Sequence, residues 1–216
     1  MTQKPYYRDI WCLGTGTGYP GAFPRGLIEK VLHRWNGEKK LMLFSGSFHK
    51  MGWETVDIKP ENNPTYVLNA EQLLDDWTEK YDLVFADPPY SELEAKSLCD
   101  LPYFNTVKVV NEMARVTRAG GYMIFLHRLI PQNFPGDTAH FKRMKLSGIV
   151  GVFTIAGYSN IRALTVWRKM EAFDFDQDNF LKPVLKEVNS RNDGISSTKN
   201  NVTSRTETKT EMESAR

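Results

Sequence analysis

An acid, two prolines and an aromatic residue stand together where a buried strand is expected to end. The apolar run of residues 83–86 predicts a strand buried on both faces, and Asp87-Pro88-Pro89-Tyr90 follows it directly. Because proline has no N–H and a fixed φ, the carbonyls of Asp87 and Pro88 are expected to point stiffly outward beside the Asp87 carboxylate. Two acceptors and a flat ring at the carboxyl end of a sheet make a clamp for a planar group that carries an NH2. The alternative is a rigid turn after a core strand.

This segment resembles the signature Asp/Asn/Ser-Pro-Pro-Tyr/Phe/Trp of the S-adenosylmethionine-dependent methyltransferases that modify amino groups of nucleic acids. Its Asp-Pro-Pro-Tyr form is most similar to that of the adenine-N6 DNA methyltransferases. The resemblance implies that Asp87 and the Pro88 carbonyl each accept one hydrogen of the exocyclic amine, which directs the nitrogen toward a methyl-sulfonium. Tyr90 would stack on the target base, which must first be flipped out of a DNA duplex. The implied catalytic residues are Asp87, Pro88, Pro89 and Tyr90.

The resemblance also implies S-adenosyl-L-methionine as the cofactor, held by segments that precede the motif. Ala22-Phe23-Pro24 is similar to the family segment Pro-Ala-x-Phe-Pro, although Gly21 stands where the family usually has proline. Phe44-Ser45-Gly46 matches the start of the family pattern Phe-x-Gly-x-Gly, whereas Phe48 takes the place of the last glycine. Small residues after a buried strand let a ligand approach the backbone closely.

Two polar residues follow the next expected strands. Asp57 lies near the tip of a strand at 54–59, where a carboxylate can accept hydrogen bonds from both ribose hydroxyls; the alternative is a solvated acid at a strand end. Asn69 holds the position of a family acid that binds the cofactor's adenine amino group, and an asparagine carbonyl can also accept that bond. The implied cofactor-binding residues are Phe23, Pro24, Phe44, Ser45, Gly46, Asp57, Asn69, Ala70 and Asp87.

Helices and strands are expected to alternate around these segments, which predicts a doubly wound sheet. A helix at 27–35 is expected to be capped by Gly37, and a helix at 105–118 to be closed by Gly120-Gly121. The other expected elements are strands at 40–44, 54–59, 66–70, 83–86 and 122–127, a helix at 71–77, a helical turn or loop at 91–98, and a hairpin-like pair at 146–155 and 162–169. This order resembles the class I methyltransferase fold, an α/β, Rossmann-like fold with a mostly parallel seven-stranded sheet and one antiparallel strand.

Length and composition predict one domain and a tail. The chain of 216 residues is long enough to bury one sizeable core. We expect residues 1–188 to form the methyltransferase domain and residues 189–216 to be disordered, because the latter contain no aromatic residue and few large apolar ones. The glycine and threonine run at 14–18 lacks a following Gly-Lys-Ser/Thr, so a flexible lead-in is favoured over a phosphate loop.

The net charge of +2 permits a DNA or RNA partner without requiring one. Basic side chains gather between residues 128 and 145, in a stretch expected to be irregular, and could hold phosphates; a solvated charged face is the alternative. The candidates are Arg128, His140, Lys142, Arg143 and Lys145. No insertion is long enough for a large target-recognition region, which predicts relaxed or short sequence recognition, or a partner specificity subunit.

Metal and membrane functions are disfavoured by what the sequence contains. The cysteines, Cys12 and Cys99, and the four histidines show no metal-ligand spacing, so we expect no metal. No apolar run approaches a membrane span, and the N-terminal residues lack the apolar core of a signal peptide, so a cytoplasmic location is expected.

Several other activities could use a similar segment. Cytosine-N4 methylation uses the same clamp, usually with Ser in place of Asp87. Methylation of RNA bases is a further alternative, and glutamine methylation normally shows Asn-Pro-Pro-Tyr. Cytosine-C5 chemistry would need a Pro-Cys pair, which this chain lacks. A catalytically silent subunit that binds cofactor or nucleic acid also stays open, because Phe48 departs from the family pattern.

Overall fold

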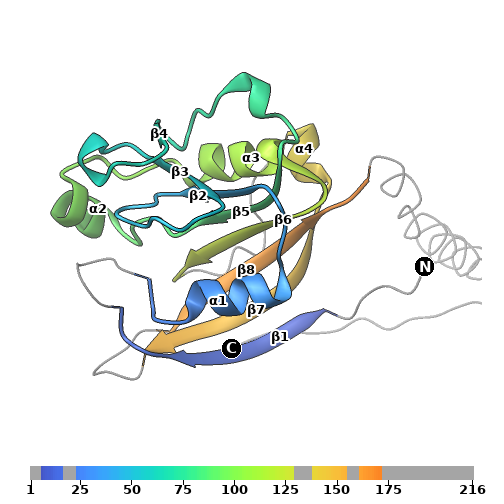
Figure 1. Ribbon diagram of the computed structural model, residues 1–216, viewed down its shortest axis with the longest axis horizontal. Coiled ribbons are helices and arrows are strands. Elements are labelled where there is room, and N and C mark those ends of the chain that lie inside the picture. The colour runs from blue at the N-terminus through green and yellow to red at the C-terminus, as the bar shows by residue number, and fades with distance from the viewer. Residues whose placement is uncertain (1–5, 17–22, 129–137, 155–160, 172–216) are drawn as a thin grey trace, which may run out of the picture. The chain divides into compact units, whose positions relative to one another are not determined.

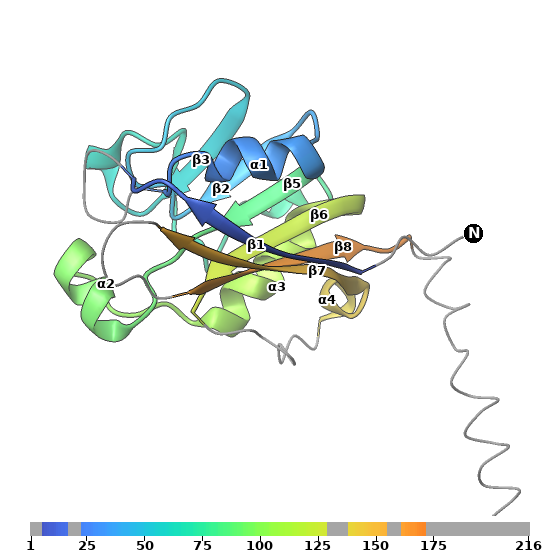
Figure 2. The ribbon, with the colours of Figure 1, turned by 90° about the horizontal axis from the view of Figure 1, so that it is seen from below.

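The computed structural model describes residues 6–16, 23–128, 138–154 and 161–171, all within the compact unit Met1–Phe175. Within these segments the chain forms an eight-stranded sheet covered by helices on both faces (Figure 1, Figure 2). The tail expected at residues 189–216 and the loop expected at 156–160 lie outside the described residues.

The strand order of the sheet is β1-β7-β8-β6-β5-β2-β3-β4. The strands are β1 (Tyr7–Leu13), β2 (Lys40–Leu43), β3 (Trp53–Asp57), β4 (Tyr66–Val67), β5 (Tyr81–Ala86), β6 (Thr117–His127), β7 (Met144–Thr154) and β8 (Arg162–Lys169). β8 runs antiparallel to β6 and β7, whereas the other neighbouring strands are parallel. From β4 to β6 the order is that of a doubly wound nucleotide-binding sheet, and the antiparallel β8 follows at its end. The expected class I methyltransferase fold is confirmed.

One strand more than the expected seven is present, because residues 7–13, for which no element was predicted, form β1. β1 pairs in parallel with β7 and extends the sheet at its edge. Its Trp11 and Leu13 are buried, and the Trp11 ring lies 6.1 Å from that of Trp35 at the end of the first helix. The run Arg8-Asp9-Ile10 is exposed throughout, so no alternation of apolar and polar residues marks this strand in the sequence.

The helices lie on opposite faces of the sheet, with α1 on one face and α3 and α4 on the other (Figure 2). Their bounds are α1 (Leu27–Arg34), α2 (Glu92–Cys99), α3 (Thr106–Val116) and α4 (Ala139–Lys142), with 3-10 turns η1 (Pro60–Asn62) and η2 (Asp75–Trp77). Among the described residues, no helix has the length and apolar character needed to cross a bilayer.

The central strand β5 connects the two halves of the core. Leu83 and Phe85 face the cluster that contains α1, whereas Val84 and Ala86 face the cluster that contains α3. All of β5 is buried, as expected for a strand covered by helices on both faces. The chain that follows Ala86 therefore starts from a fixed point at the carboxyl edge of the sheet.

Three local predictions from the sequence are wrong. Residues 71–77 form only the short 3-10 turn η2, not a helix. α1 is capped by Trp35, and Gly37 instead accommodates β5, since a Cβ at Gly37 would lie 2.2 Å from the Cβ of Asp82.

The helix expected at 105–118 ends at Val116, and its expected glycine cap lies inside β6. A Cβ on Gly121 would lie 2.8 Å from the carbonyl oxygen of Asp82, so the close approach of β5 and β6 requires glycine there.

Candidate active site

A cavity of about 790 Å³ opens at the carboxyl ends of β2, β3, β4 and β5, within the size range of small-ligand sites. Because these strands are parallel, the segments that follow them meet at one edge of the sheet. The cavity walls include all residues predicted to bind the cofactor or to act in catalysis: Phe23, Pro24, Phe44, Ser45, Gly46, Asp57, Asn69, Ala70, Asp87, Pro88, Pro89 and Tyr90.

Asp57 fixes the turn at one end of the cavity. Its Oδ2 accepts the Gly46 N–H at 2.7 Å, and its Oδ1 accepts the Lys59 N–H at 2.9 Å and the Asn62 amide at 3.1 Å. Gly46 has a positive φ of 52°, which glycine adopts without strain. Oδ2 keeps one lone pair for a ligand hydroxyl, whereas Oδ1 gains one only if Asn62 moves aside.

Phe48, which departs from the family glycine pattern, does not line the cavity. Its ring packs edge-on against those of Phe23 and Trp53, with centroids 5.5 Å and 5.8 Å away. Phe48 therefore belongs to the apolar cluster beneath the site and leaves the space beside Gly46 free.

Asn69 stands on the wall beside an aromatic pair that was not predicted. Its side-chain oxygen accepts the Glu71 N–H at 2.9 Å, which leaves the second lone pair for a ligand. The rings of Phe44 and Phe104 lie 5.1 Å apart and both line the cavity. This end of the cavity thus combines hydrogen-bonding groups with flat apolar surfaces.

At the other end of the cavity, three side chains form a chain of hydrogen bonds. The Tyr90 hydroxyl donates to Asp87 Oδ1 at 2.5 Å, and Arg162 Nη1 donates to the Tyr90 hydroxyl oxygen at 3.3 Å. Burial raises the pKa of the Asp87 carboxyl from its ordinary 3.8 to about 7, although the Tyr90 hydrogen bond and the Arg162 charge act in the opposite direction. A carboxyl group with this pKa can both accept hydrogen bonds and take up a proton near neutral pH.

Glu94 connects the motif to α2 and to Arg128. Its Oε2 accepts the Tyr90 N–H at 2.8 Å, and its Oε1 pairs with Arg128 Nη2 at 2.5 Å. The Arg128 guanidinium carbon lies 5.3 Å from the centre of the Tyr90 ring, and all three side chains line the cavity. A planar ligand that stacks on this face of Tyr90 must therefore replace a guanidinium group.

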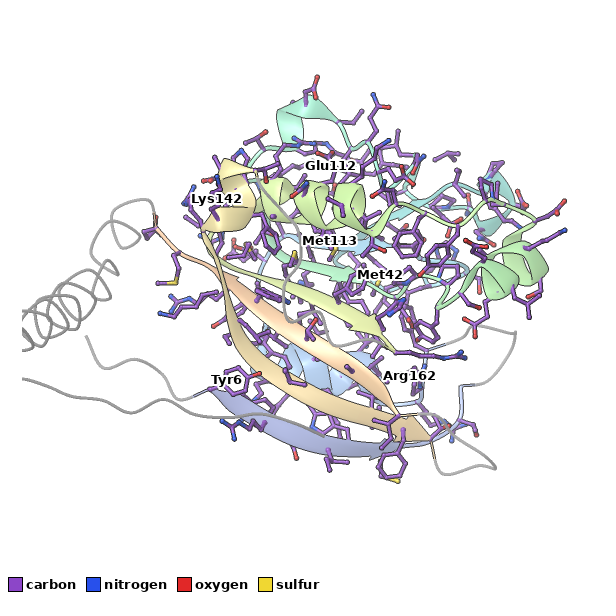
Figure 3. The ribbon with its side chains drawn as sticks, turned by 180° about the vertical axis from the view of Figure 1, so that it is seen from behind. Tyr6, Met42, Glu112, Met113, Lys142 and Arg162 are labelled. Carbon is purple, nitrogen blue, oxygen red and sulfur yellow. The ribbon has the colours of Figure 1, made fainter. Side chains whose placement is uncertain are left out.

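The structure separates the basic residues predicted to hold phosphates. Only Arg128 lines the cavity. Of the other four, His140 and Lys142 lie in α4, Arg143 caps its end and Lys145 lies at the start of β7. Lys142 and Arg162 mark opposite ends of the sheet in Figure 3. These four residues lie at the amino-terminal edge of the parallel strands, far from Asp87, so their role in holding phosphates stays a prediction.

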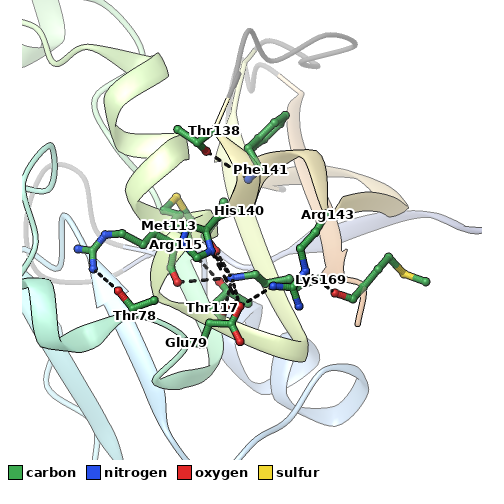
Figure 4. Close-up of polar contacts among 12 residues, drawn as sticks. Thr78, Glu79, Met113, Arg115, Thr117, Thr138, His140, Phe141, Arg143 and Lys169 are labelled. Carbon is green, nitrogen blue, oxygen red and sulfur yellow. Dashed lines mark hydrogen bonds and ion pairs between the residues drawn. The ribbon is translucent and has the colours of Figure 1, made fainter. Parts of the chain in front are cut away.

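Two basic residues at that opposite edge, Arg143 and Lys169, have partners within the fold. Arg143 Nη1 pairs with Glu79 at 2.6 Å, and Lys169 Nζ lies 3.2 Å from the same carboxylate (Figure 4). Lys169 is fully buried and donates to the carbonyls of Ala114 and Thr117 at 2.7 Å. This cluster ties α4 and β8 to the end of α3.

Two further site residues, Glu94 and Arg162, were not predicted from the sequence. Ser91 and Glu94 have the Ser-x-x-Glu spacing of a helix start, and the Ser91 side chain does accept the Glu94 N–H, so this signal was available. No sequence pattern around Arg162 indicates a site residue, because only strand pairing brings it to the cavity. In the described part of the chain, no three His, Cys, Asp or Glu side chains are grouped as metal ligands.

Comparison with known proteins gives structural matches alone. No protein-family model and no curated protein matches the sequence. A chain from the complex of the Trm112 methyltransferase activator with a methyltransferase of Haloferax volcanii is 12% identical, with a TM-score of 0.47, over 67% of this chain and 89% of that chain. A SAM-dependent methyltransferase from Methanosarcina mazei is 13% identical, with a TM-score of 0.41, over 65% and 97%.

An aminoglycoside resistance methyltransferase is 17% identical, with a TM-score of 0.30, over 48% of this chain and 62% of that chain. This chain thus spans less than two thirds of that protein's length.

Proposed function

We propose that this protein transfers a methyl group from S-adenosyl-L-methionine to the exocyclic amino group of a DNA base, with adenine N6 as the acceptor. The observation that carries the proposal is that Asp87, Pro88 and Tyr90 line one end of a cavity whose other end holds Asp57 and Asn69. The residues that would hold the amine of the acceptor base and the residues that would hold the nucleoside of the cofactor therefore lie at opposite ends of one cavity.

The residues present fit S-adenosylmethionine. The Asp57 carboxylate offers a lone pair to a ribose hydroxyl, the Asn69 oxygen offers one to an adenine amine, and the Phe44 and Phe104 rings supply flat surface. Phe23 and Pro24 line the wall that would enclose the methionine part. When bound, the cofactor supplies an electrophilic methyl group on a sulfonium.

Replacing Asp57 with alanine is expected to weaken S-adenosylmethionine binding by about 10- to 100-fold, because hydrogen bonds to charged groups contribute about 1.5–3 kcal/mol. Isothermal titration calorimetry measures the change. Asp76→Ala is the matched control, since Asp76 is exposed and does not line the cavity. Equal affinities of the Asp57 variant and the wild type would exclude the proposed ribose contact.

Asp87 and Pro88 supply the acceptors for the amine. Asp87 Oδ1 already receives the Tyr90 hydroxyl, so Oδ2 remains to accept one hydrogen of the amine, and the Pro88 carbonyl would accept the other. Holding both hydrogens reduces delocalisation of the nitrogen lone pair into the ring and points it at the methyl group. The raised pKa of Asp87 suits its carboxylate to take the proton that the methylated nitrogen releases.

Arg128 is proposed to leave the Tyr90 ring when a base stacks there and to bind a phosphate of the same strand. Arg128→Ala is then expected to raise the dissociation constant for DNA by about threefold to tenfold and to reduce the slope of log affinity against log salt concentration by about one. Fluorescence anisotropy with a labelled oligonucleotide at several salt concentrations measures both. Arg168→Ala is the control, because Arg168 is exposed at the opposite end of β8. An unchanged salt slope in the Arg128 variant would rule out the phosphate contact.

Mass spectrometry of nucleosides tests the acceptor directly. The full chain is incubated with isotope-labelled S-adenosylmethionine and with DNA or RNA, and each nucleic acid is digested to nucleosides. Labelled N6-methyladenine from DNA is expected. Label only in N4-methylcytosine or only in RNA would refute the adenine-DNA assignment, and cofactor binding without any transfer would favour a silent subunit.

A further inference from the structure

Arg162 reaches the catalytic edge of the sheet because β8 is antiparallel. The first residue of β8, and not its last, therefore lies beside the carboxyl ends of the parallel strands. The register places Arg162 opposite Val152 near the end of β7, and Ala163 opposite His127 at the end of β6. Figure 3 shows Arg162 at that end of the sheet.

The contacts of Arg162 connect it to the proposed methyl acceptor site. Its guanidinium donates to the Tyr90 hydroxyl oxygen at 3.3 Å, and that hydroxyl donates to Asp87 Oδ1 at 2.5 Å. Arg162 is partly buried, lines the cavity and pairs with no carboxylate among the described residues. Its positive charge therefore acts mainly on the Tyr90 and Asp87 pair.

We propose that Arg162 is a positioning residue for the proposed methyl transfer: its guanidinium holds the Tyr90 hydroxyl on Asp87 and keeps the Asp87 carboxylate in its charged, hydrogen-bond-accepting form. The catalytic part of this inference rests on the proposed function. The electrostatic part does not, because it concerns the ionisation of Asp87 in the protein without substrate.

The other groups that face Asp87 act in both directions. Burial raises its pKa, the Tyr90 hydrogen bond lowers it, the charge of Arg162 lowers it and the charge of Glu94 on α2 raises it. Arg128, at the end of β6, pairs with Glu94 and so reduces the effect of that acid. Burial and Arg128 also lower the pKa of His127, whose ring lies 5.5 Å from that of Tyr90, and this shift disfavours a positive charge there. Arg162 is thus the cation whose removal most directly favours a protonated Asp87.

Replacing Arg162 with glutamine is expected to move the acid limb of the pH profile of kcat/KM to higher pH. The loss of activity is then largest below neutral pH and small at alkaline pH, and each pH unit of displacement lowers the rate on the acid limb about tenfold. Arg162→Lys retains the charge and should keep the acid limb close to that of the wild type. Arg168→Gln removes the same charge from the exposed far end of β8 and should leave the profile unchanged.

Carbon-13 NMR of the carboxyl groups tests the same inference without any methyl transfer. The Asp87 signal, assigned by its absence in Asp87→Asn, is expected to titrate near pH 7 in the wild type. Its midpoint should be higher in Arg162→Gln and lower in Glu94→Gln. These titrations remain informative if the wild type methylates no base, so failure of the proposed function and failure of this inference are distinguishable.

Two results would overturn the role of Arg162. One is an Asp87 midpoint that is the same in Arg162→Gln and the wild type. The other is an active Arg162→Gln variant whose rate falls by the same factor at every pH, which would indicate a structural contribution alone.

Discussion

Alanine in place of Asp87 is expected to lower kcat for methyl transfer by about 100- to 1,000-fold, the usual effect of removing one preorganised group that stabilises charge in a transition state. Asp87 is the side chain at this end of the cavity that offers a free carboxylate oxygen, because Glu94 uses one oxygen for the Tyr90 N–H and the other for Arg128. Without Asp87, one hydrogen of the amine has no acceptor and the nitrogen lone pair stays delocalised.

Single-turnover transfer of a labelled methyl group from S-adenosylmethionine to DNA measures this effect. Urea unfolding shows whether the variant still folds, and Asp76→Ala is the control for removal of an exposed acid. Full-speed transfer by Asp87→Ala would remove the carboxylate from the proposed mechanism.

The catalytic edge of the sheet was predictable because its signals are local. β5 is apolar along its whole length, and the two prolines that follow end it at one place. Asp57 is the last residue of β3 and Asp87 directly follows β5, so parallel pairing alone brings both acids to one edge. Each residue predicted for the cofactor and for catalysis therefore lines the same cavity.

Other features of the fold and the site depend on pairings between strands that are distant in the sequence, and no local sequence pattern indicates them. β1 joins the sheet through β7, and Arg162 reaches Tyr90 because β8 runs antiparallel to its neighbours. The charge run after β6 could not be divided by sequence alone, since α4, its C-cap and the start of β7 carry four of its five residues to the opposite edge of the sheet. A run of like residues along the chain does not show which edge each residue reaches.

The ionised Asp87 carboxyl also lowers the free energy of unfolding. Its carboxyl has an ordinary pKa of 3.8, which the unfolded chain restores, and a pKa of about 7 in the fold. Between these values the folded state binds a proton that the unfolded state has lost, so stability falls as pH rises through this window and is then constant. The full difference corresponds to about 4 kcal/mol.

Asp87→Asn is therefore expected to be more stable than the wild type at about pH 8, because asparagine resembles the protonated acid and stays neutral. Its advantage should grow by about 3 kcal/mol between about pH 5 and about pH 8, as measured by urea unfolding of the two proteins without ligand. Asp76→Asn is the control, because an exposed acid has no burial to relieve. An advantage that is the same at both pH values would mean that Asp87 is not held in an environment that disfavours its charge. A growing advantage would show that the fold maintains a partly buried carboxylate just after β5 against its own stability, as expected of a group retained for its chemistry.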